Sequence, residues 1–316
     1  MKDVSYASPA PYDDTMPSMI APKEIISRLP DDSDDPRHII DILLEERCTK
    51  MASSPFWPLY KRTIYPLLRY QNAVKMADDV VGKSAMDTLN HISQLLTLNV
   101  TTQNLERIPK KGRIILASTH PTGIADGIAM FDVLKNVRPD MKIFANRDAI
   151  RAAPQLAELI IPVEWLQEKR TRQRSRETLI ETKAAFSREE CIVLFPSGRL
   201  AYMQDRVLTE QDWMISVVSL ARKYDCKVIP IHMAARNSWM YYWFRNLNDE
   251  LRDITLFNEL LNKKNKPFHL TIGNPIDPDE LDGDPEEVTK ALREHAVFDV
   301  PKDLPWKKII TDAAST

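Results

Sequence analysis

A histidine and an aspartate six residues apart are the side chains best suited to chemistry in this sequence. His120 opens the stretch His-Pro-Thr-Gly-Ile-Ala-Asp and Asp126 closes it. Histidine has an unperturbed pKa close to neutrality, and a nearby carboxylate can hold its ring and stabilise its charged form. The motif supplies no serine or cysteine nucleophile for His120, so the pair predicts a base that activates a hydroxyl of a substrate. The alternative is a core histidine satisfied by the carboxylate.

Two further groups of polar residues follow other predicted strands. The stretch Phe-Pro-Ser-Gly-Arg ends at Arg199, a planar guanidinium suited to phosphate or carboxylate, and Gly198 supplies its turn. Ser197 is not in a Gly-x-Ser-x-Gly elbow, which argues against a hydrolase nucleophile. Asn146 and Arg147 place a second guanidinium at a strand end. The alternatives are a plain turn with an exposed arginine, and a helix cap at Asn146 with Arg147 paired to the next aspartate.

Apolar runs alternate with helical segments from residue 107 onward. The apolar runs predict strands at 113–118, 142–146, 159–163, 191–195, 227–232 and 268–273. The segments between them predict helices at 124–136, 148–157, 172–187, 210–224, 249–263 and 285–297. Pro230 predicts that its strand lies at an edge or forms a bulge. The alternation predicts an α/β fold, a mostly parallel sheet flanked by helices, with an N-terminal helical arm. Ligands bind beyond the carboxyl ends of such strands, so the polar groups are expected to converge on one site.

The chain divides into four predicted regions. These are a disordered tail at 1–36, a helical arm at 37–104, an α/β domain at 105–300 and a C-terminal tail at 301–316. Asp35 before Pro36 predicts the cap of a first helix over 37–51.

Three segments are suited to contact with a membrane surface, and each also has an ordinary structural explanation. Residues 55–70 mix aromatic, aliphatic and basic side chains, and their three prolines argue against one long helix. Their alternative role is a helical arm packed on the main domain. Residues 169–176 are basic and could contact anionic lipid or a carrier protein. Their alternative role is the solvated start of a helix. Residues 239–245 are aromatic, suited to an interface or an acyl chain, or to core packing.

The composition excludes several classes of protein. A net charge of −2 argues against a nucleic-acid binder, and both glycine-rich nucleotide-binding motifs are absent. No run approaches the ~18 apolar residues of a spanning helix, and the N-terminus lacks the pattern of a secretory signal. The three cysteines lack metal-ligand spacing, which predicts no metal site and a reducing compartment.

Taken together and in this order, the motifs resemble those of the lysophospholipid (glycerophospholipid) acyltransferase family. That family has a histidine with an acidic residue shortly after it, an arginine-bearing block, Phe-Pro-x-Gly with arginine, and a Val-Ile-Pro block. The likeness covers roughly residues 105–275. The spacing His-Pro-x-Gly-x-x-Asp is similar to that of the hemolysin-like bacterial subgroup.

The resemblance implies acyl transfer from a thioester to a hydroxyl of a lysophospholipid or a related lyso-lipid. His120 is then the general base and Asp126 fixes its ring, while backbone amides near Gly123 or Gly198 stabilise the oxyanion. The implied substrate-binding residues are Gly123, Asn146, Arg147, Ser197, Gly198 and Arg199. The acyl donor is acyl-CoA or acyl carrier protein, with no further cofactor. The expected location is the inner face of the cytoplasmic membrane, as a peripheral cytoplasmic protein.

Two departures from the family pattern concern the acceptor. Five residues separate His120 from Asp126 where most members have four, and Ser197 stands where glutamate is common. The acceptor therefore stays open between a lyso-glycerolipid and a non-glycerol acceptor such as an amino-acid lipid. A non-catalytic lipid-binding protein of the same fold is the remaining alternative.

Overall fold

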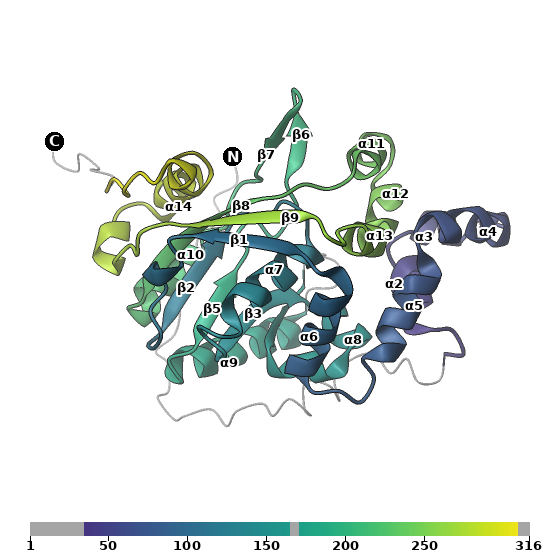
Figure 1. The fold of residues 1–316 in the computed structure, drawn as a ribbon, viewed down its shortest axis with the longest axis horizontal. Helices are drawn as coiled ribbons and strands as arrows, with labels where there is room; N and C mark the ends of the chain where they lie inside the picture. Colours follow the sequence, from purple (N-terminus) through teal and green to yellow (C-terminus); the bar gives the residue numbers. More distant parts are fainter. Residues whose placement is uncertain (1–34, 165–170, 309–316) are drawn as a thin grey trace, which may run out of the picture.

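The computed structural model describes residues 35–164 and 171–308, which form a seven-stranded sheet with helices on both faces (Figure 1). The order of the strands is β1-β9-β8-β2-β5-β3-β4. Their bounds are β1 (Asn99–Gln103), β2 (Ile114–Ser118), β3 (Met141–Asn146), β4 (Ile160–Val163), β5 (Cys191–Leu194), β8 (Lys227–Ala234) and β9 (Pro267–Ile272). A separate hairpin pairs β6 (Tyr202–Gln204) with β7 (Val207–Thr209). The tail predicted at 1–36 lies almost wholly outside the described residues.

The pairing confirms the predicted α/β architecture with a mostly parallel sheet. β8, β2, β5, β3 and β4 are parallel, whereas β9 runs antiparallel to β8 and pairs in parallel with β1. The six predicted strands are all present. β1 is absent from the prediction because its sequence Asn-Val-Thr-Thr-Gln is polar and almost fully exposed. It begins at Asn99, so the sheet includes residues assigned by sequence to the helical arm.

Alternate side chains of the strands enter two cores, one on each face of the sheet. Ile114 and Leu116 belong to the larger core, and Ile115 and Ala117 to the smaller one. This period of two is what a strand buried on both faces requires. The helices that contribute buried side chains to the larger core include α2 (Ile39–Glu45), α5 (Tyr70–Asp79), α6 (Ala85–Leu96), α7 (Ile124–Leu134), α8 (Asp148–Ala152), α12 (Asp249–Ile254) and α13 (Leu256–Leu261). Those of the smaller core are α9 (Arg172–Ser187), α10 (Ser216–Tyr224) and α14 (Pro285–Glu294).

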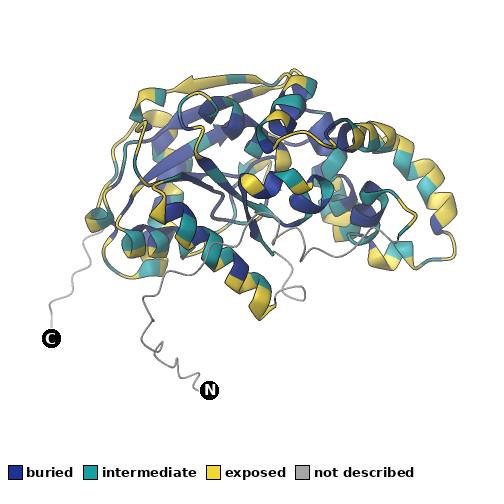
Figure 2. Ribbon diagram, turned by 90° about the horizontal axis from the view of Figure 1, so that it is seen from below, coloured by how far each residue is buried: buried dark blue, intermediate teal, exposed yellow. Residues whose placement is uncertain are grey.

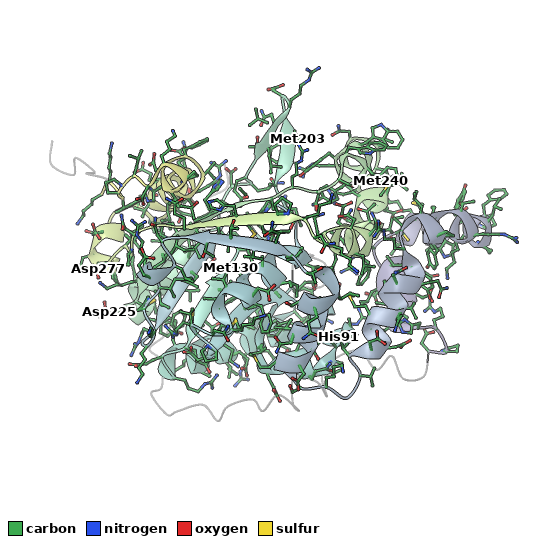
Figure 3. All side chains as sticks on the ribbon, viewed as in Figure 1. His91, Met130, Met203, Asp225, Met240 and Asp277 are labelled. Atoms are coloured by element: carbon green, nitrogen blue, oxygen red, sulfur yellow. The ribbon has the colours of Figure 1, made fainter. Side chains whose placement is uncertain are left out.

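The two ends of the parallel strands carry different elements. The carboxyl ends lead to His120, to the β6–β7 hairpin and to α11 (Trp239–Leu247). Met203 of the hairpin and Met240 of α11 lie toward this end, and Asp225 and Asp277 lie at the other (Figure 3). The fold thus gathers the predicted polar groups at one end of the sheet.

Several helices begin or break where the sequence did not predict it. α2 starts at Ile39 because the His38 ring accepts the Ile40 N–H at 3.1 Å, so the cap predicted at Asp35 is wrong. α2 ends at Glu45, so the helix predicted over 37–51 is divided, and its last part forms a separate short helix, α3 (Thr49–Ala52). α10 starts at Ser216 rather than at 210, because the preceding residues form a loop fixed to the site described below. The segment 249–263 is divided into α12 and α13.

Pro230 lies in a central strand, so its predicted place at a sheet edge is wrong. The alternative, a bulge, agrees with the register. Regular pairing of β8 with β9 ends at Ile231 and Ile272, and one further bridge joins Val228 to Ile276. The partner segment holds one residue more than β8 between these pairs, which is the definition of a bulge.

The segment predicted at 55–70 contains a single helix, α4 (Trp57–Leu67). Its prolines do not divide it, because Pro58 lies in the first turn, where the amide has no partner in the helix, and Pro66 in the last. Trp57 is buried. No helix among the described residues combines the length and the apolarity needed to cross a membrane.

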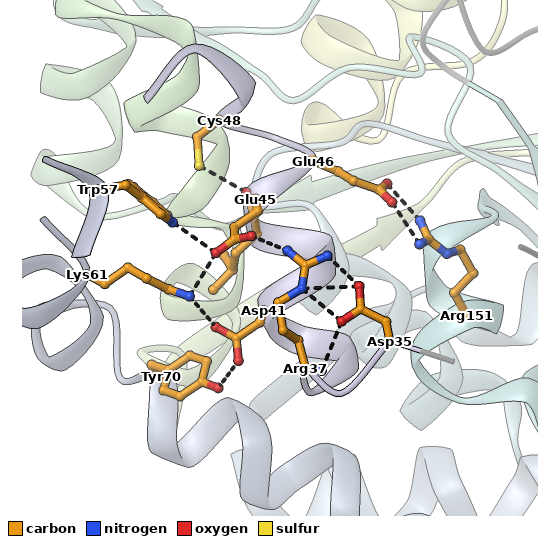
Figure 4. Close-up of polar contacts among 11 residues, drawn as sticks. Asp35, Arg37, Asp41, Glu45, Glu46, Cys48, Trp57, Lys61, Tyr70 and Arg151 are labelled. Atoms are coloured by element: carbon orange, nitrogen blue, oxygen red, sulfur yellow. Dashed lines mark hydrogen bonds and ion pairs between the residues drawn. The ribbon is translucent and has the colours of Figure 1, made fainter. Parts of the chain in front are cut away.

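Ion pairs join the helices of the arm to one another and to the α/β domain (Figure 4). Lys61 of α4 lies 2.7 Å from Glu45 and 3.2 Å from Asp41, both on α2. Glu46, just after α2, binds Arg151 of α8 at 2.8 Å. The outer face of α4 stays exposed (Figure 2). Its large apolar side chains in contact with solvent, with the residue before the helix, are Phe56, Leu59, Tyr60 and Leu67.

Candidate active site

His120 and Asp126 meet beyond the carboxyl end of β2, where the chain enters α7. Nδ1 of His120 lies 2.9 Å from Oδ2 of Asp126, and their side chains are 6% and 0% exposed. The imidazole stacks on Phe195, with ring centres 4.3 Å apart. Since Nδ1 faces the carboxylate, Nε2 is the nitrogen that can exchange a proton with a substrate. The structure therefore brings the predicted pair together in the geometry of a base and its orienting carboxylate.

Asp126 is fixed by the first turn of its own helix. Its Oδ2 accepts the backbone N–H groups of Thr122 at 2.8 Å and Gly123 at 2.9 Å, and its Oδ1 accepts the Thr122 hydroxyl. Gly123 has φ +93°, and a Cβ there would lie 3.0 Å from Leu200. Only glycine suits both conditions. The turn thus holds the carboxylate in one orientation toward His120.

The backbone amides expected to form an oxyanion site are already engaged. The Gly123 N–H donates to Asp126, and the Gly198 N–H donates to the carbonyl of Phe195 at 2.9 Å. Gly198 has φ +59° and closes a tight turn after β5. These two amides thus have partners within the protein, and the oxyanion role expected of amides near Gly123 or Gly198 stays a prediction.

The turn after β5 packs directly against His120, as predicted from the strand ends. β5 is the neighbour of β2 in the sheet, and the Ala201 N–H donates to the His120 carbonyl at 3.0 Å. The Ser197 hydroxyl donates to the carbonyl of Arg199 at 2.8 Å, and Ser197 is buried. The Arg199 side chain is exposed. Of the predicted substrate-binding residues, Arg199 is the one positioned to meet a charged ligand in solvent.

A second buried carboxylate lies beside His120, and the sequence analysis missed it. Glu210 accepts the backbone N–H of His120 and the indole N–H of Trp213, each at 3.1 Å. Burial raises the pKa of Glu210, while these hydrogen bonds oppose the shift. In the sequence Glu210 falls at the start of a predicted helix, where an acidic residue is common. The spacing Glu-x-x-Trp was the only available signal.

Asn146 and Arg147 do not reach His120. β3 lies two strands from β2, or ~10 Å at the usual spacing of strands. Arg147 is buried and binds Glu177 of α9 at 2.7 Å. The Asn146 side chain accepts the Asp148 N–H at 3.0 Å. The alternative interpretation is only partly met, because the N-cap of α8 is Arg147 and the partner of Arg147 is Glu177 rather than Asp148. The anion-binding role of these residues remains a prediction.

The described residues offer neither a metal cluster nor a reactive thiol. No group of three or more His, Cys, Asp or Glu side chains in 35–164 and 171–308 could hold a metal ion. Burial raises the pKa of the thiols of Cys48, Cys191 and Cys226 to about 12, so they stay protonated at neutral pH. Cys191 and Cys226 both lie in the core.

Comparison with known proteins shows what this chain is similar to. Residues 99–234 match the family model described as Acyltransferase. The match covers a little less than half of the chain. The matched region extends from β1 through β8 and contains the His120–Asp126 pair and the turn after β5. The resemblance seen in the motifs is thus confirmed, and the protein is an enzyme that transfers acyl groups.

Relatives of this acyltransferase include two curated enzymes. The lyso-glycine lipid O-acyltransferase of Phocaeicola vulgatus is 27% identical over 255 residues, which cover 77% of this chain and 88% of that protein. The enzyme of the same name from Bacteroides thetaiotaomicron is 23% identical over 252 residues, covering 77% and 90%. The crystal structure of the 1-acyl-sn-glycerophosphate acyltransferase of Thermotoga maritima matches with a TM-score of 0.44 and 14% identity, covering 85% of this chain and all of that one.

Proposed function

We propose that this acyltransferase moves a fatty acyl group from an acyl thioester to a hydroxyl of a lyso-lipid, with His120 as general base. The observation that carries the proposal is the 2.9 Å contact between His120 Nδ1 and the fixed Asp126 carboxylate. A carboxylate in that position holds the imidazole with Nε2 available for the substrate and stabilises the imidazolium that forms. A lipid-binding protein without catalysis has no need of this arrangement.

The reaction needs one base and no enzyme nucleophile. Nε2 of His120 takes the proton as the acceptor oxygen attacks the thioester carbon. The tetrahedral intermediate then breaks its C–S bond, and the proton held by His120 passes to the departing sulfur. The products are an ester and a free thiol, from CoA or from acyl carrier protein. Arg199, exposed beside the pair, binds an anionic group of one substrate.

The acceptor we favour is an amino-acid lipid rather than a lysophospholipid. Two relatives that cover most of this chain are named for a lyso-glycine lipid, which supports this choice. It also agrees with Ser197 standing where glycerolipid acyltransferases commonly have glutamate. A direct test compares a lyso-glycine lipid with 1-acyl-sn-glycerophosphate at equal concentrations. Faster acylation of the glycerophosphate would overturn this choice while leaving acyl transfer intact.

Peripheral membrane contact is part of the proposal. The β6–β7 hairpin, α11 and α4 carry exposed apolar side chains. These include Met203, Val207, Trp239, Trp243, Leu247, Phe56 and Leu59. Arg245 of α11 lies over the ring of Tyr202 at 4.7 Å, which joins the hairpin to α11. Aromatic and cationic side chains together suit the interface of a bilayer. The cytoplasmic face of the membrane is the location we propose.

Replacement of His120 tests the mechanism. His120→Ala is expected to lower kcat/KM at least ~100-fold, because a positioned general base typically contributes that much. His91→Ala is the matched control: His91 lies on α6 next to Asp79, well away from the hairpin and α11 (Figure 3). It should keep full activity. Equal activity of His120→Ala and the wild type would overturn the assigned role.

A further inference from the structure

The side chain of Asn237 has an unusual environment near the catalytic pair. Asn237 is 4% exposed, and neither Oδ1 nor Nδ2 has a hydrogen-bond partner among the described residues. Buried amides nearly always find partners, because an unpaired one costs about 1–3 kcal/mol. Such a group in a folded protein requires an explanation, and binding of a ligand is one.

The backbone around Asn237 is rigidly held, so the position of its amide is set in advance. Its N–H donates to the Tyr242 hydroxyl at 3.0 Å. The next residue, Ser238, donates its N–H and its hydroxyl to the two oxygens of Glu259, at 2.8 and 2.6 Å. Lys263 binds the same carboxylate at 3.0 Å, and this ion pair is almost fully buried. Each neighbour is satisfied, and the amide of Asn237 is the exception.

This cluster adjoins the His120–Asp126 pair. Asn237 follows β8 by three residues, and β8 is bonded to the segment before His120: Thr119 accepts the Met233 N–H at 2.9 Å. α13, which carries Glu259, packs against α7, which carries Asp126. Burial lowers the pKa of Lys263, and the charges of Glu259 and Asp126 oppose that shift. Asp126 also helps to raise the pKa of Tyr242, after burial and Glu259.

We propose that Asn237 binds the acyl acceptor, with its side-chain amide hydrogen bonded to a polar group next to the reacting hydroxyl. The amide offers two donors and one acceptor, so it suits a neutral group that both donates and accepts, an amide or a second hydroxyl. A phosphate or carboxylate, which only accepts, would leave the Asn237 oxygen unpaired. The inference rests on the proposed acyl transfer to a lyso-lipid and narrows its acceptor.

Asn237→Leu tests this inference through the KM values and the melting temperature, which would change differently if Asn237 had a purely structural role. With the lyso-glycine lipid varied at saturating donor, the acceptor KM is expected to rise ~10-fold or more, since one lost hydrogen bond in a closed site costs about that factor. The KM for the donor should not change. The melting temperature should be equal to or above that of the wild type, because leucine has the same branched shape and needs no partner. Asn237→Ala repeats both measurements without added bulk.

Thr289→Val is the matched control. The Thr289 hydroxyl is also buried without a partner among the described residues, but it lies on α14, which belongs to the core of the other face. This variant should keep its melting temperature and both KM values. An unchanged acceptor KM in both Asn237 variants would overturn the inference. So would a raised donor KM, a lower kcat with both KM values intact, or a fall of several degrees in melting temperature. If the wild type acylates neither lyso-lipid, the proposed function fails first and the inference fails with it.

Discussion

At the scale of single residues, His120 lies against two carboxylates in unlike surroundings. Asp126 accepts two backbone N–H groups and a hydroxyl, so it is oriented before any substrate arrives. Glu210 touches the backbone of His120 rather than its ring. One carboxylate therefore sets the direction of the imidazole, and the other fixes the main chain that carries it. This division explains how a ring at the end of a strand stays in place.

The pH dependence of stability should reveal Glu210. Burial raises its pKa in the folded protein, so the folded state holds this proton more tightly than the unfolded chain. The protonated Glu210 stabilises the folded state fully below the pKa of Glu210 in the unfolded chain, about 4.5. This contribution is lost as the pH rises through the pKa of Glu210 in the folded protein. The melting temperature of the wild type minus that of Glu210→Gln should thus fall as the pH rises from 4 to 8. A constant difference across this range, measured by thermal denaturation, would contradict it.

The sequence identifies residues whose neighbours lie close along the chain and misses those brought together by folding. His120, Asp126 and Gly123 share one turn, so their spacing alone predicts their contact. Asn237 becomes informative only when its burial is known. Glu210 needs the loop after the hairpin to fold back on β2, which no local pattern encodes. Sequence separation, more than residue type, decides which site residues can be predicted.

At the scale of elements, a buried ion pair joins β3 to α9. Arg147 lies at the end of β3 and Glu177 on α9, and both side chains are almost fully buried. Strand ends of this kind favour ligand contacts in parallel sheets, which is why the sequence predicts an anion site here. The structure shows an arginine already occupied by an internal carboxylate. Helix α9 is thereby fastened to the edge of the sheet.

Arg147→Met should destabilise the protein by about 3–5 kcal/mol, because the buried Glu177 carboxylate then loses the Arg147 guanidinium. The double variant Arg147→Met/Glu177→Leu should recover most of that loss, since a well-packed apolar pair can replace a buried ion pair. Chemical denaturation measures both. If the double variant folds well but has a much higher KM for an anionic substrate, Arg147 binds substrate as the family resemblance implies. If its KM is unchanged, the pair is structural.

At the scale of the whole molecule, the hairpin, α11 and α4 carry the exposed apolar residues of the proposed membrane surface. The hairpin and α11 follow the carboxyl ends of the strands, as His120 does (Figure 1). Elements from three separate parts of the sequence make up this surface. The sequence predicts its α11 and α4 segments as interfacial candidates, but their common position depends on contacts such as that of Glu250 of α12 with the backbone of Lys50. Local composition predicts which segments can contact a membrane, and the tertiary structure determines how they lie relative to one another.

Flotation with anionic liposomes tests this surface. Trp239→Ser/Trp243→Ser is expected to weaken binding ~10-fold or more, because each tryptophan is at least half exposed and its transfer to the interface is favourable by at least ~1 kcal/mol. Val81→Ser is the matched control: Val81 is 78% exposed but lies between α5 and α6, outside this surface. Equal flotation of the tryptophan variant and the control would rule out α11 as a membrane contact.

Because all three thiols are buried and protonated, a cysteine introduced on the surface can be labelled selectively. Cys48, Cys191 and Cys226 are at most 3% exposed, and a thiol that stays protonated reacts slowly with maleimides. A single cysteine introduced at an exposed position of the hairpin, as in Val207→Cys, would then be the one fast-labelling site in the chain. A polarity-sensitive fluorophore attached there would report in real time when this end of the enzyme leaves water for lipid.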